Sequence, residues 1–434
     1  MQGSISQLFT HYQKHPNICI DSRTAEPGSF FFAIKGDRFD GNVFAEDAIE
    51  RGCACAVVDD EKYKKDARFI LVSNALQSLQ QLALYYRKNL NIPVIGITGT
   101  NGKTTTKELI TAVLSEKFHV HATHGNFNNH IGVPLTILSI TADTQIAVVE
   151  MGANHIGEIE TLCNISLPTH GLITNIGIAH LEGFGSPKGV IKAKKELYDF
   201  ISNNKGTAFV NKDNELLTKL SKSIHRVTYG TSNDVFCMGQ MLSVLSFVSL
   251  NYRCGSKGAE RKVINSRLFG AHNFENILAA ICVGQYFEVE PSRIKKAIEN
   301  YIPSNNRSQI INSGKNTIIL DAYNANPMNM RAAINGFSQM ETEKKMVILG
   351  DMLELGRYAY DEHSKIIDLL KNYKFDPVIL VGENFLKLKD EIPCIHFSHT
   401  KEAEEWLKTH EITGMHILIK GSRGIGLEKL VPLL

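Results

Sequence analysis

Val94-Ile-Gly-Ile-Thr-Gly-Thr-Asn-Gly-Lys-Thr-Thr-Thr106 is the stretch that decides the fold. An apolar run, typical of a buried strand, passes through glycines into Lys103 and Thr104, and a helical pattern begins directly afterwards. In such a loop several backbone N–H groups point into one concavity at the helix N-terminus, a lysine adds positive charge, and a hydroxyl can hold Mg²⁺. The stretch therefore predicts a strand, a phosphate-binding loop and a helix, with ATP as the ligand.

The loop is a variant of the common spacing G-x-x-x-x-G-K-[ST]. That spacing needs a glycine at position 97, where this chain has Ile97, and the glycines here are Gly96, Gly99 and Gly102. The alternative is an ordinary glycine-rich turn, but a turn does not need lysine and threonine directly after its last glycine. We therefore retain the phosphate-binding interpretation.

Composition indicates a globular protein of about two to three domains. Of the 434 residues, 43% are hydrophobic and 21% are charged, which excludes a disordered or fibrous chain. Lysine and arginine together number 47, against 45 for aspartate and glutamate, so the net charge of +2 provides no general field that would attract nucleic acid. Any anion-binding site must therefore be local, and we expect no nucleic-acid partner.

Cysteine usage and hydropathy both favour a cytoplasmic location. The eight cysteines are scattered, and only Cys53 and Cys55 are close, at a spacing unlike that of a zinc or redox pair. We expect them to be small buried residues in a reducing cytosol. The N-terminus lacks a basic segment leading into an apolar core, and the apolar run from Met241 to Leu250 is interrupted by serines and too short to span a bilayer. We expect no membrane insertion.

The fold class predicted is α/β, in three units. Residues 1–86 form a small α/β unit, residues 87–305 alternate strands and helices in the way that produces a mostly parallel sheet, and residues 306–434 resemble a doubly wound, Rossmann-like unit. Expected strands cover residues 29–34, 54–58, 69–72, 146–150, 171–175, 317–320, 346–349, 378–381 and 416–419. Expected helices cover residues 45–51, 75–87, 187–201 and 273–286, and residues 235–268 favour further strands.

Candidate site residues gather at the carboxyl ends of the predicted parallel strands, where ligands bind in open sheets. Glu150 follows an apolar run, so its carboxylate would face the phosphate-binding loop as a Mg²⁺ ligand, although such a residue alone is more often a helix cap or a solvated strand end. His180 lies beyond another apolar strand and could offer an imidazole to a metal or a phosphate. Lys192-Ala-Lys-Lys195 follows on the next helix, and the residues alone favour a solvated basic face.

Polar loops supply further candidates. Thr123-His-Gly-Asn-Phe-Asn-Asn-His-Ile-Gly-Val-Pro134 crowds asparagines and histidines between two structured elements, and the amides of Asn126 and Asn129 could contact neutral sugar or peptide atoms of a substrate. Turn-building asparagine is the competing explanation. Asp321-Ala-Tyr-Asn-Ala-Asn-Pro327 ends another apolar strand, where a nucleotide could contact it. Gly421-Ser-Arg-Gly-Ile-Gly426 has the wrong spacing for an NAD site and is interpreted as a turn or anion nest.

Six motifs together carry a family resemblance. They are Gly99-Thr-Asn-Gly-Lys-Thr-Thr105, His124-Gly-Asn-Phe-Asn-Asn-His-Ile-Gly132, Glu150-Met-Gly-Ala-Asn-His155, Thr174-Asn-Ile-Gly-Ile-Ala-His-Leu-Glu-Gly-Phe-Gly185, Asp321-Ala-Tyr-Asn-Ala-Asn-Pro327 and Leu349-Gly-Asp-Met-Leu-Glu-Leu-Gly356. Over nearly its whole length the chain resembles the Mur ligases, most closely those that add D-alanyl-D-alanine. The resemblance implies an N-terminal domain for a uridine nucleotide, a central P-loop ATPase domain, and a C-terminal Rossmann-like domain that closes over ATP.

The resemblance also implies roles for individual residues. It places Lys103 on the transferred phosphoryl group, Thr104 and Glu150 on a first Mg²⁺, and His180 with Lys194 on a second, because the family's lysine that captures CO₂ as a carbamate falls on Lys194. The loop residues Gly99, Thr100, Asn101, Gly102, Lys103, Thr104 and Thr105 would contact the ATP phosphates, and Asn273, Arg307, Asp321 and Asn324 its base, ribose or phosphates. In Asp21-Ser-Arg23, Ser22 and Arg23 would contact the uridine diphosphate, whereas Asn42 stands where many relatives have histidine.

The implied reaction is ATP-dependent joining of D-alanyl-D-alanine to UDP-N-acetylmuramoyl-tripeptide through an acyl phosphate, by a monomer. Two rivals remain at this stage. A folylpolyglutamate synthetase shares the phosphate loop and the modified lysine, but the uridine-type first unit and the asparagine-rich loop argue against it. A nucleotide-gated interaction protein would not need Lys103, Glu150, His180 and Lys194 together.

Overall fold

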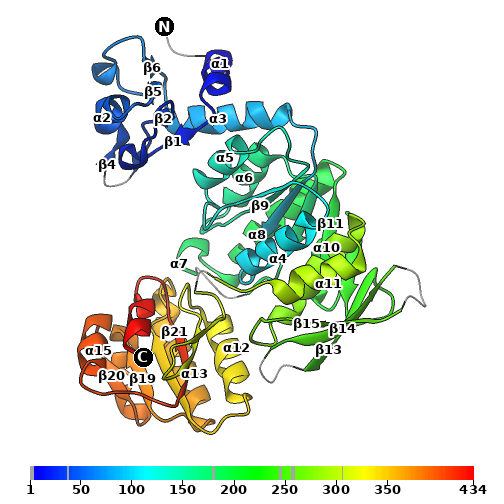
Figure 1. The fold of residues 1–434 in the computed structure, drawn as a ribbon, viewed down its shortest axis with the longest axis vertical. Coiled ribbons are helices and arrows are strands. Elements are labelled where there is room, and N and C mark those ends of the chain that lie inside the picture. The colour runs from blue at the N-terminus through cyan, green and yellow to red at the C-terminus, as the bar shows by residue number, and fades with distance from the viewer. Residues whose placement is uncertain (1–3, 37–38, 178–180, 244–246, 256–259, 305) are drawn as a thin grey trace.

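The strand and helix expected around the phosphate-binding loop are both present in the computed structural model, which describes residues 4–36, 39–177, 181–243, 247–255, 260–304 and 306–434. Strand β7 is Val94–Thr98 and helix α4 is Lys103–Ser115. Strands β9 and β10 pair with β7 in parallel on either side, which explains why every residue of β7 is buried. The described residues form four sheets. The four-stranded and two-stranded sheets lie in the N-terminal part of the chain, the nine-stranded sheet in the central part and the six-stranded sheet in the C-terminal part, as Figure 1 shows.

The first sheet lies in the N-terminal part and is parallel, in the order β1-β2-β5-β6. Phe30 and Phe32 pack on one face with α1 and α3, and Phe31 packs on the other with α2, as the two-residue period of a strand requires. The elements are α1 (Ile5–Lys14), β1 (Ile18–Cys19), β2 (Phe30–Phe32), β3 (Lys35–Gly36), β4 (Phe39–Asp40), α2 (Ala45–Glu50), β5 (Cys55–Val58), β6 (Phe69–Leu71) and α3 (Ala75–Lys88).

The first and central domains share one hydrophobic core. Leu79 and Leu82 of α3 belong to the same buried cluster as Ile137 of α5 and Leu162 of α6. The junction is also tied by a hydrogen bond, because the hydroxyl of Tyr86, on helix α3, donates to the Ile140 carbonyl at 2.6 Å. Figure 1 shows α3 as the long blue helix between the first sheet and the central domain. The expected boundary between residues 86 and 87 falls inside α3, and both domain boundaries stay predictions.

The central sheet has the order β15-β14-β13-β12-β11-β10-β7-β9-β8 and is parallel except where β14 pairs with β13 and with β15. Helices α4, α10 and α11 cover one face, and α5, α6 and α8 cover the other. The remaining elements are β8 (Val120–Ala122), α5 (Gly132–Leu138), β9 (Ile146–Glu150), α6 (Glu158–Ser166), β10 (His170–Ile173), α7 (Leu181–Phe184), α8 (Pro187–Asn203), β11 (Thr207–Asn211), α9 (Glu215–Leu220), β12 (His225–Gly230), β13 (Cys237–Ser243), β14 (Ser249–Cys254), β15 (Lys262–Asn265), α10 (Asn273–Tyr286) and α11 (Pro291–Asn300).

The C-terminal sheet has the order β16-β17-β21-β18-β19-β20, with only β16 antiparallel among its described strands. Helices α12 and α13 pack on one face, and α15 with the 3₁₀ helix Leu427–Leu433 on the other, which confirms the α/β fold class. The elements are β16 (Gln309–Asn312), β17 (Thr317–Leu320), α12 (Pro327–Ser338), β18 (Lys345–Gly350), α13 (Ala359–Lys371), β19 (Val378–Val381), α14 (Glu383–Leu386), β20 (Ile395–Phe397), α15 (Thr400–Leu407) and β21 (His416–Lys420). None of the helices in the described parts of the chain has the length and apolar character that crossing a bilayer requires.

One expectation about the cysteines is wrong. Cys237 and Cys254 are paired as a disulfide, because the antiparallel register of β13 and β14 sets them directly opposite each other with their Cα atoms 4.1 Å apart. Seventeen residues separate them in sequence, and nothing in their spacing indicated the pairing. The other six cysteines are free, and all of them except Cys394 are buried as expected.

A buried histidine in the central domain leads to a prediction about acid stability. His170 packs among Phe209, Tyr286 and Phe287, and burial lowers its pKa to about 4. Between pH 6.5 and 4 the unfolded chain binds a proton at this histidine that the folded chain does not, so the free energy of unfolding falls as the pH falls through that window, by up to about 3 kcal/mol. We expect His170→Gln to flatten this part of the pH dependence in urea unfolding, and an unchanged slope would contradict the assignment.

Candidate active site

A cavity of about 820 Å³ lies where the carboxyl ends of β7 and β9 face the C-terminal domain. Most of the residues that the sequence singled out line it, although they come from two domains. They are Gly99, Thr100, Asn101, Gly102, Lys103, Thr104, Thr105, Asn126, Asn129, Glu150, Lys194, Asn273, Arg307, Asp321 and Asn324. Ser22 and Arg23 do not line this cavity, and His180 lies outside the described residues.

The loop glycines are required by backbone shape and by close approach. Gly99 has φ +147° and Gly102 has φ +78°, in the region that side chains disfavour. A Cβ atom on Gly99 would lie 2.0 Å from the Thr174 hydroxyl, and one on Gly102 would lie 2.6 Å from Asn276 Oδ1. Glycine is therefore needed at 99 and 102, and the apolar strand position Ile97 has no such requirement.

Lys103 starts helix α4 and folds back over the loop. Its ammonium group donates to the carbonyl oxygens of Gly99 and Thr100 at 2.8 and 3.2 Å. Burial lowers the pKa of Lys103, with an opposing effect from Glu150 and a further lowering from Arg307. Both of these hydrogen bonds are to neutral carbonyl groups, and no ion pair of Lys103 with a carboxylate is found among the described residues, so the ammonium group can turn to an anionic ligand in the cavity.

Glu150 presents one carboxylate oxygen that the protein does not use. The side chain is 1% exposed, and its Oε1 accepts hydrogen bonds from the Thr104 hydroxyl at 3.1 Å and from Asn128 Nδ2 at 2.8 Å. Its Oε2 is buried and has no partner among the described residues. An unsatisfied buried carboxylate oxygen is costly, and with a threonine hydroxyl beside it the donor set fits a hard divalent cation such as Mg²⁺.

Lys194 is a buried lysine, which overturns the solvated-face interpretation for this residue. Its side chain on α8 is 2% exposed, with the ammonium nitrogen 5.3 Å from the centre of the Phe184 ring. Burial lowers its pKa to about 7, with a further lowering from Lys103 and opposing effects from Glu158 and Glu196. At neutral pH much of this amine is uncharged and nucleophilic.

The neighbouring lysines fit the solvated-face interpretation. Lys192 is exposed, and Lys195 forms an ion pair with Asp199 one helical turn away. Helix α8 therefore presents one lysine of the motif to the cavity and leaves the other two to solvent.

The C-terminal domain contributes a cationic and aromatic wall. The Arg307 guanidinium lies 3.7 Å from the centre of the Tyr323 ring, and its Nε is buried without a partner. Lys420, which is 1% exposed, bonds to Asp321 Oδ2 at 2.6 Å. On the central domain, Asn273 Nδ2 donates to the Phe269 carbonyl at 2.7 Å. These groups can hold a flat ring and a polyanion.

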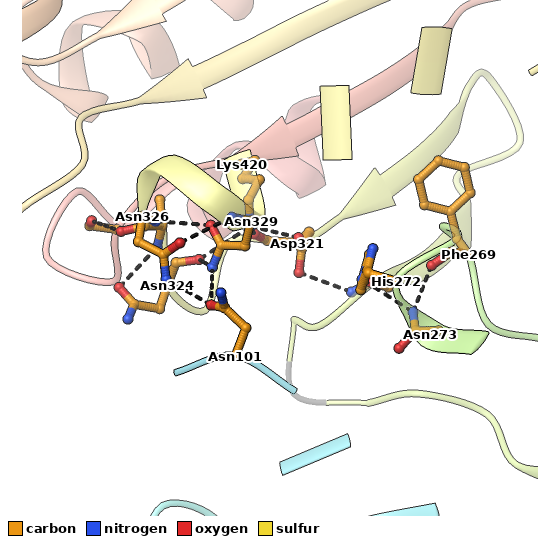
Figure 2. A network of polar contacts seen from close by, with 12 residues as sticks. Asn101, Phe269, His272, Asn273, Asp321, Asn324, Asn326, Asn329 and Lys420 are labelled. Carbon is orange, nitrogen blue, oxygen red and sulfur yellow. Dashed lines mark hydrogen bonds and ion pairs between the residues drawn. The ribbon is translucent and has the colours of Figure 1, made fainter. Parts of the chain in front are cut away.

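Asn101 joins the phosphate-binding loop to the C-terminal domain, as Figure 2 shows. Its Oδ1 accepts from Asn326 Nδ2 at 2.7 Å and from Asn329 Nδ2 at 3.2 Å. Its main-chain carbonyl accepts from the Thr174 hydroxyl at 2.6 Å and from Asn175 Nδ2 at 3.1 Å. The loop is thus held from both domains.

The first domain carries its candidate residues outside the cavity. Ser22 is buried, while the Arg23 guanidinium is exposed and bonds to Asp21 at 2.6 Å, which lowers the pKa of that carboxyl to about 2. Asn42 is fully buried and donates to both Asp40 and Asp59. The residue that departs from the family pattern therefore serves the internal structure of this domain.

Sequence reasoning missed several cavity residues. Lys420 had a usable signal, because it follows an apolar strand just as Asp321 does, and β17 and β21 are neighbours in the sheet. Asn128 lines the cavity, and Asn326, which does not, bonds to a residue that does. Both lay inside motifs already quoted, but nothing in one sequence shows that Asn128 would reach Glu150 or that Asn326 would reach Asn101.

Comparison with known proteins identifies the family. The Mur ligase middle domain matches residues 97–284, the Mur ligase glutamate ligase domain residues 306–423, and the Mur ligase family catalytic domain residues 15–100. The UDP-N-acetylmuramoyl-tripeptide--D-alanyl-D-alanine ligase of Bacillus subtilis is 36% identical over 427 residues, covering 95% of this chain and 92% of that protein. The chain belongs to the Mur ligase family. The protein is therefore an enzyme, a ligase.

Solved structures agree with the fold of this Mur ligase. The crystal structure of MurF from Acinetobacter baumannii is 31% identical with a TM-score of 0.86, and the match covers 100% of this chain and 98% of that one. MurF ligase from Thermotoga maritima in complex with ADP is 24% identical with a TM-score of 0.84, and the match covers 97% of each chain. The second likeness concerns the fold alone.

Proposed function

We propose that this Mur ligase joins D-alanyl-D-alanine to UDP-N-acetylmuramoyl-tripeptide and consumes ATP. The observation that carries the proposal is the cavity in which Lys103, Glu150 and Lys194 of the central domain face Arg307 of the C-terminal domain. Similarity over 95% of the chain to the Bacillus subtilis ligase supports the choice of substrates. A nucleotide-linked precursor and ATP are cytoplasmic compounds, so the reaction belongs in the cytoplasm.

The ATP phosphates would lie on the loop from Gly99 to Thr105, where the backbone N–H groups and Lys103 meet their charge. The base, ribose or phosphates would lie against Asn273, Arg307, Asp321 and Asn324, which line the same cavity. Arg307 supports this placement because its buried Nε has no protein partner.

Thr104 and Glu150 would hold one Mg²⁺, which neutralises phosphate charge when bound. Lys194 would hold a second as its carbamate, with His180 as the family's further ligand. The uncharged amine of a lysine with a pKa of about 7 can attack CO₂ and lose a proton, which replaces a cationic side chain with a carboxylate. Glu150 supports the first site through its unpartnered oxygen.

The tripeptide carboxylate needs activation because it is anionic and has no leaving group. Attack of this carboxylate on the γ-phosphorus gives an acyl phosphate and ADP, and Lys103 would stabilise the charge on the transferred group. The D-alanyl-D-alanine amine then attacks the acyl carbon, and phosphate leaves as the peptide bond forms. The uridine diphosphate would lie at Ser22 and Arg23, and the muramoyl peptide near Asn126 and Asn129.

An isotope experiment tests the function. With oxygen-18 in the terminal carboxylate of UDP-N-acetylmuramoyl-tripeptide, we expect one labelled oxygen in the released orthophosphate. Steady-state release of ADP should require both the tripeptide and D-alanyl-D-alanine. Unlabelled phosphate would exclude the acyl phosphate. Turnover with a folate and glutamate in place of these substrates would favour the folylpolyglutamate synthetase alternative, and ADP release without any acceptor would favour a nucleotide-gated protein.

A further inference from the structure

Asn326 both caps the N-terminus of helix α12 and contacts the phosphate-binding loop. Its Oδ1 accepts the Asn329 N–H at 3.0 Å, while Asn329 Oδ1 accepts the Asn326 N–H at 2.9 Å, so the pair forms a reciprocal N-cap. A cap of this kind needs only the acceptor oxygen of residue 326. Its amide nitrogen is therefore spare, and it is this nitrogen that reaches Asn101 in the phosphate-binding loop at 2.7 Å.

The contact lies at a place where the loop needs external support. Asn101 lies between Gly99 and Gly102, which both have positive φ angles. Glycine is the residue type with the most backbone freedom, so contacts from outside the loop are needed to hold it in one conformation. The side-chain oxygen of Asn101 receives both donors from α12, which fixes the orientation of its amide. The amide nitrogen of Asn101 is left buried without a partner among the described residues.

The same contact continues into the wall of the cavity. Asn329 Nδ2 also lies 3.4 Å from the Asn324 carbonyl, which accepts from Lys420 at 3.2 Å, and Lys420 pairs with Asp321. Figure 2 shows this line of polar contacts from Asn101 through α12 to Asp321. The loop that would hold the phosphates and the residues that would hold the ribose are thus linked through one helix start.

We propose that Asn326 and Asn329 act as positioning residues, a latch through which the C-terminal domain sets the phosphate-binding loop for the nucleotide by holding Asn101. The inference rests on the proposed nucleotide site and adds how the two domains act on each other there. Formation of the latch and binding of the nucleotide are two coupled equilibria, and such coupling is reciprocal. If the closed latch strengthens nucleotide binding by a given factor, bound nucleotide favours the closed latch by the same factor.

The test is a double-mutant cycle on the full-length protein, with ADP affinity measured by calorimetry. Asn326→Ser keeps a good N-cap but is shorter and has no amide, so it removes the contact with Asn101. We expect it to raise the Kd for ADP about tenfold, the usual order for a lost hydrogen-bond pair at a buried interface. In an Asn101→Ala background the same substitution should change the Kd by less than about twofold, because the partner is already absent.

A matched control separates the latch from helix capping. Asn214 caps α9 by accepting the Leu217 N–H at 3.1 Å, and it does not line the cavity. Asn214→Ser makes the same change of side chain at a cap and likewise keeps a good N-cap, so it should leave the thermal unfolding midpoint and the Kd for ADP close to the wild-type values. X-ray scattering of the Asn326→Ser variant with saturating ADP should also show a larger radius of gyration than wild type.

The outcomes distinguish the latch from the function on which it rests. A wild-type protein that binds neither ADP nor ATP would reject the proposed nucleotide site. Wild-type binding combined with an unchanged Kd in Asn326→Ser, or with equal effects of that substitution in both Asn101 backgrounds, would reject the latch and leave the nucleotide site standing.

Discussion

Replacing Lys194 by alanine should lower turnover at least about 100-fold, because it removes the only buried lysine on α8 within the described residues, and with it the carboxylate that CO₂ would create there. Short acids such as formate or acetate should restore part of the rate by entering the vacated space. Below pH 7 the amine is protonated and captures CO₂ poorly, so wild-type activity should depend more steeply on added bicarbonate at pH 6 than at pH 8. Steady-state rates with and without each acid measure the effect.

The control is a lysine that also has a lowered pKa but lies away from the cavity. Lys345 begins β18 in the C-terminal domain, and its ammonium group donates to the Ser338 carbonyl at 2.6 Å. Lys345→Ala should lose stability without any rescue of activity by acids. A Lys194→Ala enzyme that turns over as fast as wild type would remove the carbamate from the mechanism.

Glu150→Gln should lower turnover by about 10²–10³-fold. Glutamine keeps the size of the side chain and an oxygen that can accept from Thr104 and Asn128, so the fold should persist. It replaces the unpartnered Oε2 with an NH₂ group that cannot bind a cation. Titration with Mn²⁺, followed by electron paramagnetic resonance in the presence of ADP, should show at least about tenfold weaker binding.

Glu362→Gln serves as the comparison for loss of a buried carboxylate. Glu362 pairs with Arg331 and Lys365, each at 2.6 Å, and belongs to the C-terminal domain. This variant should unfold at lower urea concentration with unchanged Mn²⁺ affinity. Equal Mn²⁺ affinity in Glu150→Gln and wild type would exclude Glu150 as a ligand.

The sequence predicted the fold best where apolar runs are long and bounded. Strands 146–150, 317–320 and 378–381 and the helix 273–286 have the bounds expected, because buried parallel strands and a fully buried helix leave continuous apolar signatures. Short elements such as β1 and β20 gave no signal, since two or three residues show no periodicity. The Cys237–Cys254 pair was missed because it depends on register alone.

The candidate site was predictable where residue type and strand position agree. Glu150 and Asp321 end apolar strands, and the structure brings both to the cavity with the phosphate-binding loop. For Lys194 the residues alone indicated solvent, and only family resemblance singled it out from Lys192 and Lys195. Contacts between domains, such as Asn101 with Asn326, join residues 225 positions apart and have no local signature.

The hydrophobic core that spans the first and central domains has a consequence for substrate length. Since α3 is packed against α5 and α6, the distance from Ser22 to Lys103 is set by a stiff frame. With the uridine diphosphate at the proposed site beside Ser22 and the acceptor carboxylate at the proposed phosphate site beside Lys103, a peptide stem one residue shorter would end about 3.5 Å before the phosphate. The fixed distance between the two proposed sites would therefore select a precursor whose peptide stem has the full length of three residues.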